Sequence, residues 1–170
     1  VGSVRCVLET AYNAYTYGGF WCGALTLVCD LLKGFLPVFL YIRVSGGTPL
    51  GLVLVMSAPA LGHIFPIWHK FDGGKGIAVS FGVLLGLAPN MLPVLTLALT
   101  YLLFSLVFKV NPHFYRLILT YSTAFGIILL TSRSIPVTLG CAAVFVIVLL
   151  KIISVRDTYD KMTVRAAWKR

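Results

Sequence analysis

Six apolar segments separated by short polar loops constrain the fold of this sequence more than any other feature. A membrane-spanning helix needs about 20 mainly apolar residues. The third segment is short and rich in glycine, so we expect it to be tilted or partly interfacial. The pattern predicts an all-α fold, a polytopic transmembrane helix bundle that forms one domain over residues 1–170. The candidate spans cover residues 20–42, 50–68, 77–88, 92–108, 114–131 and 135–153.

The composition supports a membrane protein and argues against nucleic-acid binding. Of the 170 residues, 59% are hydrophobic and 11% are charged, whereas a soluble domain carries about 25% charged residues. The polar side chains are therefore too few to cover a water-facing surface. The net charge is +9, but the basic residues are scattered between apolar segments and form no basic face on a soluble scaffold. We expect membrane lipids as partners, and no nucleic acid.

The lysines and arginines are distributed unevenly between the two sides of the predicted bundle. With six spans both chain ends lie on one side, and this side holds eleven basic residues against two, Arg43 and Arg133, on the other. The positive-inside rule places the crowded side in the cytoplasm. The segregation supports the number of spans and predicts a cytoplasmic C-terminus. The eleven are Arg5, Lys70, Lys75, Lys109, Arg116, Lys151, Arg156, Lys161, Arg165, Lys169 and Arg170.

A loop of three glycines and a lysine, Gly73-Gly74-Lys75-Gly76, joins the second and third segments on the predicted cytoplasmic side. Glycines accept positive φ angles, so backbone N–H groups can point into one concavity. With a lysine and a helix N-terminus beside it, such a loop favours a phosphate. The loop is not a Walker A motif, because no serine or threonine follows the lysine, and a flexible loop is the alternative. Asp72 opposes anion binding unless it is paired.

Other polar residues allow two interpretations each. Asp30 and Lys33 lie three apart on one face of the first span, where they either support a polar cavity or neutralise each other and fix helix packing. His63 binds either a substrate phosphate or a backbone carbonyl. Ser3 either donates a hydrogen bond to a phosphate or caps a helix. His63 and His69 lack the set of carboxylates or thiolates that would complete a metal site, so we expect no metal, and the family resemblance given below implies no organic cofactor either.

Two motifs in the same order resemble a known family. Leu61–Val79 contains LGHIFP followed by FDGGKG, and residues 30–34 read DLLKG. Together they resemble the bacterial membrane-integral glycerol-3-phosphate acyltransferases that use acyl phosphate, the PlsY family. The resemblance implies seven spans, so that a further helix would precede Val1. It also implies that His63 supports a phosphate-binding loop made of Gly73, Gly74, Lys75 and Gly76, and that Ser3 belongs to the family's first motif.

The two ends of the chain depart from the family pattern. Beyond Gly2-Ser3 the first motif does not continue, and without gaps its arginine falls on Asn13. The first lysine of the family's glycine loop is Asp72 here. The third motif, a histidine and an asparagine followed by Gly-x-Glu, is not recognisable, and the tail has residues 155–160 in its place. The fold should therefore transfer, whereas the third-motif residues do not.

The resemblance implies an acyltransferase of phospholipid biosynthesis in the bacterial inner membrane. It would transfer a fatty acyl group from acyl phosphate to the hydroxyl of glycerol 3-phosphate, giving lysophosphatidic acid and phosphate. Lys75 and Ser3 would be the catalytic residues. One alternative is a catalytically inactive relative that binds a lipid or a phosphorylated ligand. Another is a small transporter with Asp30 and Lys33 on its pathway.

Overall fold

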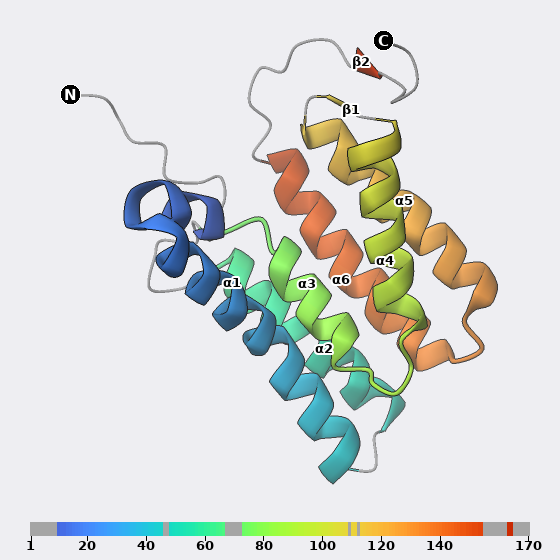
Figure 1. Ribbon diagram of the computed structural model, residues 1–170. Coiled ribbons are helices and arrows are strands. Elements are labelled where there is room, and N and C mark those ends of the chain that lie inside the picture. Colours follow the sequence, from blue (N-terminus) through green and yellow to red (C-terminus); the bar gives the residue numbers. More distant parts are fainter. Residues whose placement is uncertain are drawn as a thin grey trace.

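The computed structural model describes residues 10–45, 48–66, 73–108, 110–111, 113–154 and 163–164, and this part of the chain is an α-helical bundle (Figure 1). The predicted all-α membrane bundle is confirmed. A π-helical turn, η2, continues the fourth helix. The elements are α1 (Thr10–Val44), α2 (Pro49–Ile64), α3 (Ile77–Leu85), α4 (Leu92–Leu102), η2 (Leu103–Val107), β1 (Val110–Asn111), α5 (His113–Thr131), α6 (Ile135–Ser154) and β2 (Thr163–Val164).

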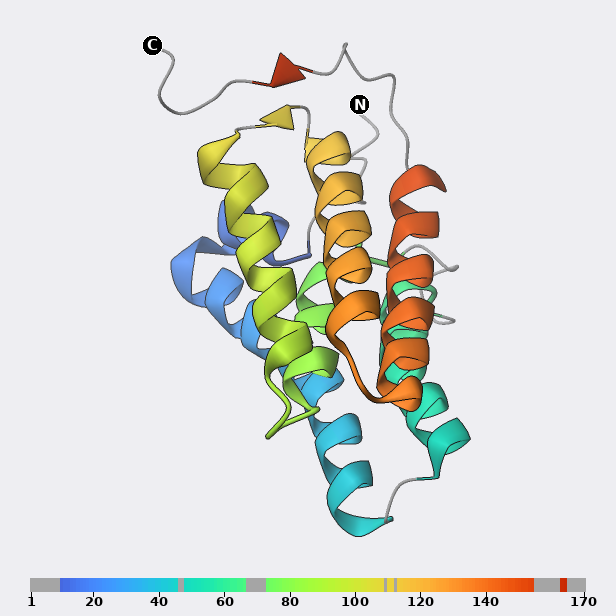
Figure 2. The same ribbon diagram turned by 90° about the vertical axis from the view of Figure 1, so that its right-hand side faces the viewer.

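The helices run alternately up and down, so that the connections gather at two ends (Figures 1 and 2). One end, here called the loop end, carries the start of α3, the start of α5 and the last turn of α6. Lys75, Arg116 and Lys151 belong to this end, whereas Arg43 and Arg133 belong to the opposite end. The described residues thus keep the charge segregation that the sequence predicts.

The helix lengths differ in part from the predicted spans. Within the described residues, three segments are long and apolar enough to cross a membrane, namely Gly18–Val44, His113–Thr131 and Ile135–Ser154. The helices over Pro49–Ile64 and Leu92–Val107 are apolar but shorter. As predicted, α3 is the shortest of the described α-helices, with nine residues.

The first apolar span agrees with the prediction, because it covers Gly18–Val44 against the predicted residues 20–42. Helix α1 itself begins before this span, at Thr10, and is kinked at Gly19, whose φ is 79° and ψ 179°. Residues 10–18 mix threonine, asparagine and glycine with alanine and tyrosine, so this first part forms no continuous apolar run. The backbone conformation at Gly19 is accessible to glycine at little cost, which explains why the kink falls there.

A short strand pair also lies outside the sequence prediction. Val110 pairs with Val164 and Asn111 with Thr163 in antiparallel register, so the C-terminal tail contacts the connection between η2 and α5. Two residues are too few to produce a strand periodicity, and the tail's mixed composition therefore gave no signal. The two strands lie outside the helices, so the bundle itself remains α-helical.

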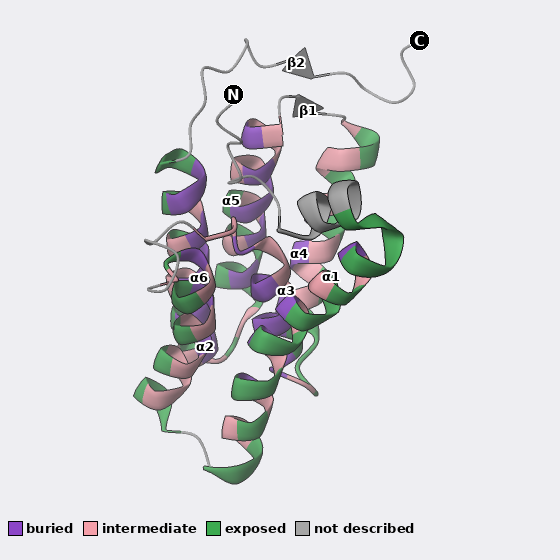
Figure 3. Ribbon diagram, turned by 90° about the vertical axis from the view of Figure 1, so that its left-hand side faces the viewer, coloured by how far each residue is buried: buried purple, intermediate pink, exposed green. Residues whose placement is uncertain are grey.

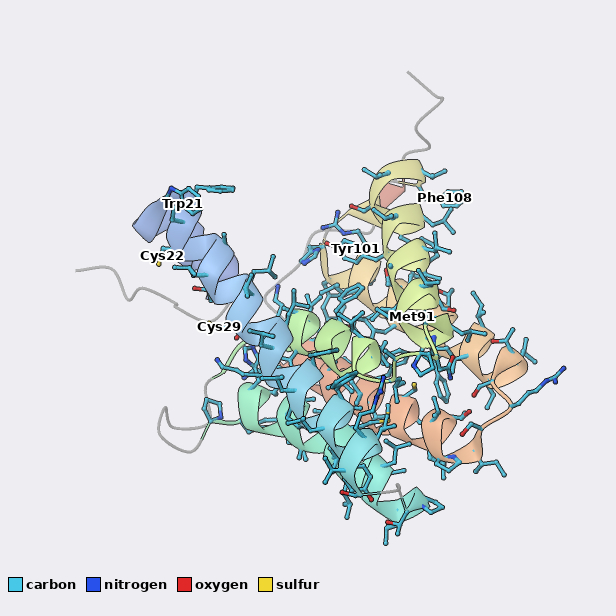
Figure 4. The ribbon with its side chains drawn as sticks, turned by 60° about the horizontal axis from the view of Figure 1, so that its bottom comes forward. Trp21, Cys22, Cys29, Met91, Tyr101 and Phe108 are labelled. Atoms are coloured by element: carbon cyan, nitrogen blue, oxygen red, sulfur yellow. The ribbon has the colours of Figure 1, made fainter. Side chains whose placement is uncertain are left out.

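Burial separates an inward face from an apolar outer face on each helix (Figure 3). The buried core includes Val38, Met56, Leu97, Tyr121 and Phe145. The outer surface is also apolar, as Leu130 (87% exposed) and Trp21 (78% exposed) illustrate. Trp21 lies on the part of α1 that extends away from the other helices (Figure 4). Extended exposed apolar surface of this kind suits lipid rather than water.

Helices α1 and α3 approach each other closely through glycines. A Cβ added at Gly82 of α3 would lie 2.1 Å from the carbonyl oxygen of Leu31, and one added at Gly34 of α1 would lie 2.3 Å from that of Val79. Small residues allow such backbone contacts in membrane bundles. The contact fixes the position of α3, and hence of the glycine–lysine loop at its start, relative to Asp30 of α1.

A buried hydrogen bond connects α3 to α5. The Ser80 hydroxyl donates to the carbonyl oxygen of Ile77 at 2.7 Å and lies 2.6 Å from the Tyr121 hydroxyl. Because the only hydroxyl hydrogen of Ser80 is already used, Tyr121 is the donor in the second bond. The Tyr121 ring packs edge-on against Phe145 of α6, with 5.1 Å between centroids. The first turn of α3 is therefore held from two further helices.

Candidate functional site

The Asp30 carboxylate joins α1 to the end of α2. Its Oδ1 accepts a hydrogen bond from Lys33 Nζ at 3.3 Å and lies 3.5 Å from His63 Nδ1. Asp30 is 3% exposed, whereas the Lys33 side chain is 62% exposed. The buried carboxylate thus has two nitrogen partners, one from its own helix and one from α2. The sequence indicated the Asp30–Lys33 pair, but it did not indicate the contact with His63.

Gly73 returns the chain to the end of α2. Its N–H donates to the carbonyl oxygen of Ile64 at 3.2 Å. A Cβ at this position would lie 2.1 Å from the carbonyl oxygen of His63, so only glycine fits without moving the backbone. His63 therefore holds Asp30 with its side chain while its own backbone packs against the first residue of the loop.

Gly76 forms the junction between the loop and α3. Its φ of 75° and ψ of 10° place it in the left-handed region at the N-cap of α3. A Cβ there would lie 2.7 Å from Ile64 Cδ1 and 3.5 Å from Val148 Cγ2. Glycine is thus favoured by the left-handed backbone conformation, while the end of the Ile64 side chain would have to move and Val148 lies at an ordinary van der Waals distance. Among the described glycines, positive φ occurs here and at Gly19.

The loop leads into a helix N-terminus with a lysine beside it. The first intrahelical bond of α3 runs from Ser80 N to the carbonyl oxygen of Gly76, at 2.9 Å. The N–H groups of residues 77–79 precede that bond, and groups in this position favour anions. Lys75 is half-buried and directly precedes Gly76. We call this region the loop site, and it consists of residues 73–76, the start of α3, the end of α2 and the neighbouring turn of α6. Its chemistry suits a phosphate.

Lys151, in the last turn of α6, is a residue of this region that the sequence reading counted only as a topology charge. It is 6% exposed, and its Nζ lies 5.7 Å from the ring centroid of Phe65, at the end of α2. Its position at i+3 from Val148, which contacts Gly76, puts both residues on one face of α6. The sequence contained one signal for this burial, because Lys151 follows the apolar Val148 by three residues and so lies on the same face of the helix.

Several predicted residues lie outside the described residues. These are Ser3, Asp72 and His69, so their placement stays a prediction. Asn13 lies in α1, but its side chain is not described. Within the described ranges, no group of three or more His, Cys, Asp or Glu side chains is placed to hold a metal ion.

The fold and the loop site together define a polytopic α-helical membrane protein with a glycine–lysine loop at one end of its bundle. The profile of the family described as glycerol-3-phosphate acyltransferase matches residues 9–163. The chain therefore belongs to the glycerol-3-phosphate acyltransferase family, and the resemblance predicted from the two motifs is confirmed.

Individual relatives agree with this assignment. The glycerol-3-phosphate acyltransferase of Myxococcus xanthus is 37% identical over 139 residues, which are 82% of this chain and 70% of the relative. That of Burkholderia pseudomallei (strain K96243) is 33% identical over 139 residues, 82% of this chain and 68% of the relative. Both alignments extend well beyond the two motifs.

A solved structure has the same fold. The crystal structure of PlsY (YgiH), an integral membrane glycerol 3-phosphate acyltransferase, in its glycerol 3-phosphate form has a TM-score of 0.70 and 24% sequence identity. The similarity covers 85% of this chain and 70% of that one. At this level of identity the match supports the helical arrangement.

Proposed function

We propose that this protein transfers a fatty acyl group from acyl phosphate to the hydroxyl of glycerol 3-phosphate. The observation that carries the proposal is the loop site itself. Gly73 packs against the backbone of α2, where a Cβ would clash, Gly76 adopts a left-handed conformation at the N-cap of α3, and together they set Lys75 at the N-terminus of α3. A built-in phosphate site at the loop end of a lipid-facing bundle suits a phosphorylated acceptor and a lipid-like donor. The family membership supports acyl transfer to glycerol 3-phosphate, and acyl phosphate as the donor is our proposal.

The proposed reaction needs little chemistry from the protein. The acceptor hydroxyl attacks the acyl carbonyl, a carbon–oxygen ester bond forms, and the anhydride bond to the donor's phosphate breaks. The hydroxyl proton leaves with the phosphate, so the products are lysophosphatidic acid and inorganic phosphate. Because acyl phosphate is already activated, positioning and charge stabilisation suffice. No metal or organic cofactor enters this scheme.

Each site residue has a role in this proposal. Lys75 and the N–H groups at the start of α3 hold a substrate phosphate, and Ser3 helps to orient it. The buried Asp30, with Lys33 and His63, keeps α1 and α2 together beneath the loop. We also propose that the loop end faces the cytoplasm of a bacterial cell, where glycerol 3-phosphate is found, and that the donor enters from the inner membrane.

The test is acyl transfer by the purified protein with palmitoyl phosphate and radiolabelled glycerol 3-phosphate. Lys75→Ala should lower kcat/KM for glycerol 3-phosphate by about 10- to 100-fold, since a charge-assisted hydrogen bond contributes about 1.5–3 kcal/mol. Arg133→Ala is the matched control, because this exposed cation lies at the opposite end. Equal activity of the two variants would remove the loop from the mechanism.

A second candidate function is binding without turnover. It is favoured by Asn13 at the position of the family's first-motif arginine and by the unrecognised third motif. Under this alternative the folded protein would bind radiolabelled glycerol 3-phosphate, Lys75→Ala would weaken that binding, and no lysophosphatidic acid would form. Measuring binding and turnover on the same preparation separates the two functions.

A further inference from the structure

Arg116, in the first turn of α5, has a buried hydrogen-bond donor without an acceptor. Its Nε is buried and has no hydrogen-bond partner among the described residues. A buried polar group costs free energy unless it is hydrogen-bonded, and the cost is larger for a charged group. Asp30 is the only carboxylate side chain that the structure describes, and it pairs with Lys33 and His63. Within the described ranges, the charge of Arg116 therefore has no carboxylate partner.

The position of Arg116 in its helix is also unfavourable for a cation. The first turn of α5, which begins at His113, contains no acidic residue. The positive end of the helix dipole lies there, so this turn disfavours a cation and favours an anion. The local sequence therefore does not stabilise the charge. An anion bound beside Arg116 would compensate both the guanidinium and the helix end.

Two ring side chains hold the guanidinium of Arg116 in place. Its Cζ lies 6.0 Å from the ring centroid of Tyr101, a residue of α4, which packs beside α5 (Figure 4). Its Nη2 contacts Nδ1 of His113, and this ring nitrogen is the acceptor, because a guanidinium carries only donors. Neither contact uses Nε. Arginine binds phosphate through an edge of its planar group with two parallel N–H donors, and the edge that contains Nε can serve in this way.

The surroundings of Arg116 suit a phosphate that is carried by an acyl chain. Leu102 and Leu103 directly follow Tyr101 and are 50% and 40% exposed, so the end of α4 presents apolar surface that suits lipid. The π-helical turn η2 starts at Leu103, and such turns are frequent at functional sites. Arg116 as a whole is half-buried. A ligand from the neighbouring lipid can therefore reach part of its side chain.

We propose that Arg116 is the centre of a second anion site, which binds the phosphate of the acyl donor; this rests on the proposed acyl transfer. The site consists of Arg116 and Tyr101, and neither residue belongs to the loop site. The proposed reaction has two phosphorylated substrates, and the loop site suits one phosphate. Arg116 supplies the charge and the N–H groups for the other, while the Tyr101 ring positions the guanidinium.

The experiment compares Arg116→Met and Arg116→Lys with the matched control Arg43→Met in the intact protein. Arg43 also lies over an aromatic ring, with its Cζ 5.0 Å from the Phe39 centroid, but at the opposite end of the bundle. We expect Arg116→Met to raise the KM for palmitoyl phosphate by about 10- to 100-fold, as for a lost charge-assisted hydrogen bond. Arg116→Lys keeps the charge but loses the planar edge, so it should restore this KM only in part. Arg43→Met should leave it unchanged.

A structural role for Arg116 predicts a different pattern. Because the first turn of α5 disfavours a cation, Arg116→Met without substrate should melt at or above the wild-type temperature. An unchanged KM for palmitoyl phosphate would overturn the proposal, whether or not the melting temperature falls. So would a rise in KM that is confined to glycerol 3-phosphate. If Arg116→Met does not fold, Arg116→Lys carries the test, because its KM for palmitoyl phosphate must still exceed that of wild type.

A binding measurement keeps this proposal separate from the proposed function. The probe is palmitoyl phosphate, and the readout is the rise in melting temperature that it produces beyond that produced by hexadecanol, which has an equally long chain without an anion. If wild type makes no lysophosphatidic acid but shows this rise, and Arg116→Met abolishes it, acyl transfer fails and the phosphate site stands. If Arg116→Met turns over with the KM values of wild type, acyl transfer stands and the site fails.

Discussion

The close contact between α1 and α3 makes Gly82→Ala a sharp test of how the loop site is positioned. The added Cβ would lie 2.1 Å from the carbonyl oxygen of Leu31 and 3.0 Å from its carbonyl carbon. Since Cβ atoms are not found within about 3 Å of other heavy atoms, the backbones must separate by about 1 Å, which is overpacking of a kind that typically costs about 1–3 kcal/mol. Such a shift moves α3 and the loop at its start away from Asp30.

Gly126→Ala supplies the matched control. Gly126 lies in α5, and nothing stands within 4 Å of a Cβ built there. Both substitutions replace a helical glycine by alanine, which by itself stabilises a helix by up to about 1 kcal/mol. The control therefore measures the propensity gain, and its difference from Gly82→Ala measures the close contact.

The assay is thermal unfolding of both variants together with acyl transfer. For a protein of this size, 1 kcal/mol shifts the melting temperature by about 2–4 °C, so Gly82→Ala should melt about 2–12 °C below Gly126→Ala. A displacement of about 1 Å at the start of α3 should also reduce kcat/KM by up to 100-fold. If the two variants melt together and turn over equally, the close packing of α1 and α3 does not position the site.

Two further substitutions test the attachments of the loop. Gly73→Ala should lower kcat/KM for glycerol 3-phosphate at least about tenfold, because its Cβ meets the His63 carbonyl oxygen at 2.1 Å; wild-type kinetics would mean that the loop does not rest on α2. Tyr121→Phe should lower the unfolding free energy by about 1 kcal/mol, with little change in KM, because Ser80 keeps its bond to Ile77. An unchanged melting temperature would show that this bond contributes nothing to stability.

The arrangement of the spans could be predicted because two independent signals agree. Apolar runs located the helices to within a few residues for α3, α5 and α6, and the segregation of Lys and Arg supported their number. The glycine content of residues 77–88 also indicated a short third helix. These are properties of local sequence and of the bilayer, so they need no knowledge of tertiary packing.

Other features depended on contacts between distant residues. Residues 10–18 are helical although they form no continuous apolar run. The kink that follows them depends on the positive φ of the single residue Gly19. The contact of His63 with Asp30 joins two helices whose register no single segment specifies. Lys151 was assigned to a side of the membrane by counting charges, a procedure that contains no information on burial. The family motifs identified the loop glycines, but only the structure shows the reasons, which are a backbone clash at Gly73 and a left-handed conformation at Gly76.

The most direct test of the account compares acyl donors on the purified wild-type protein with glycerol 3-phosphate as the acceptor. We predict that palmitoyl phosphate yields one lysophosphatidic acid for each inorganic phosphate released, and that palmitoyl-coenzyme A yields none. Product can be identified by mass spectrometry and phosphate counted in the same reaction. Folded protein that gives no lysophosphatidic acid from palmitoyl phosphate, while still being stabilised by glycerol 3-phosphate, would contradict acyl transfer and leave a binding role.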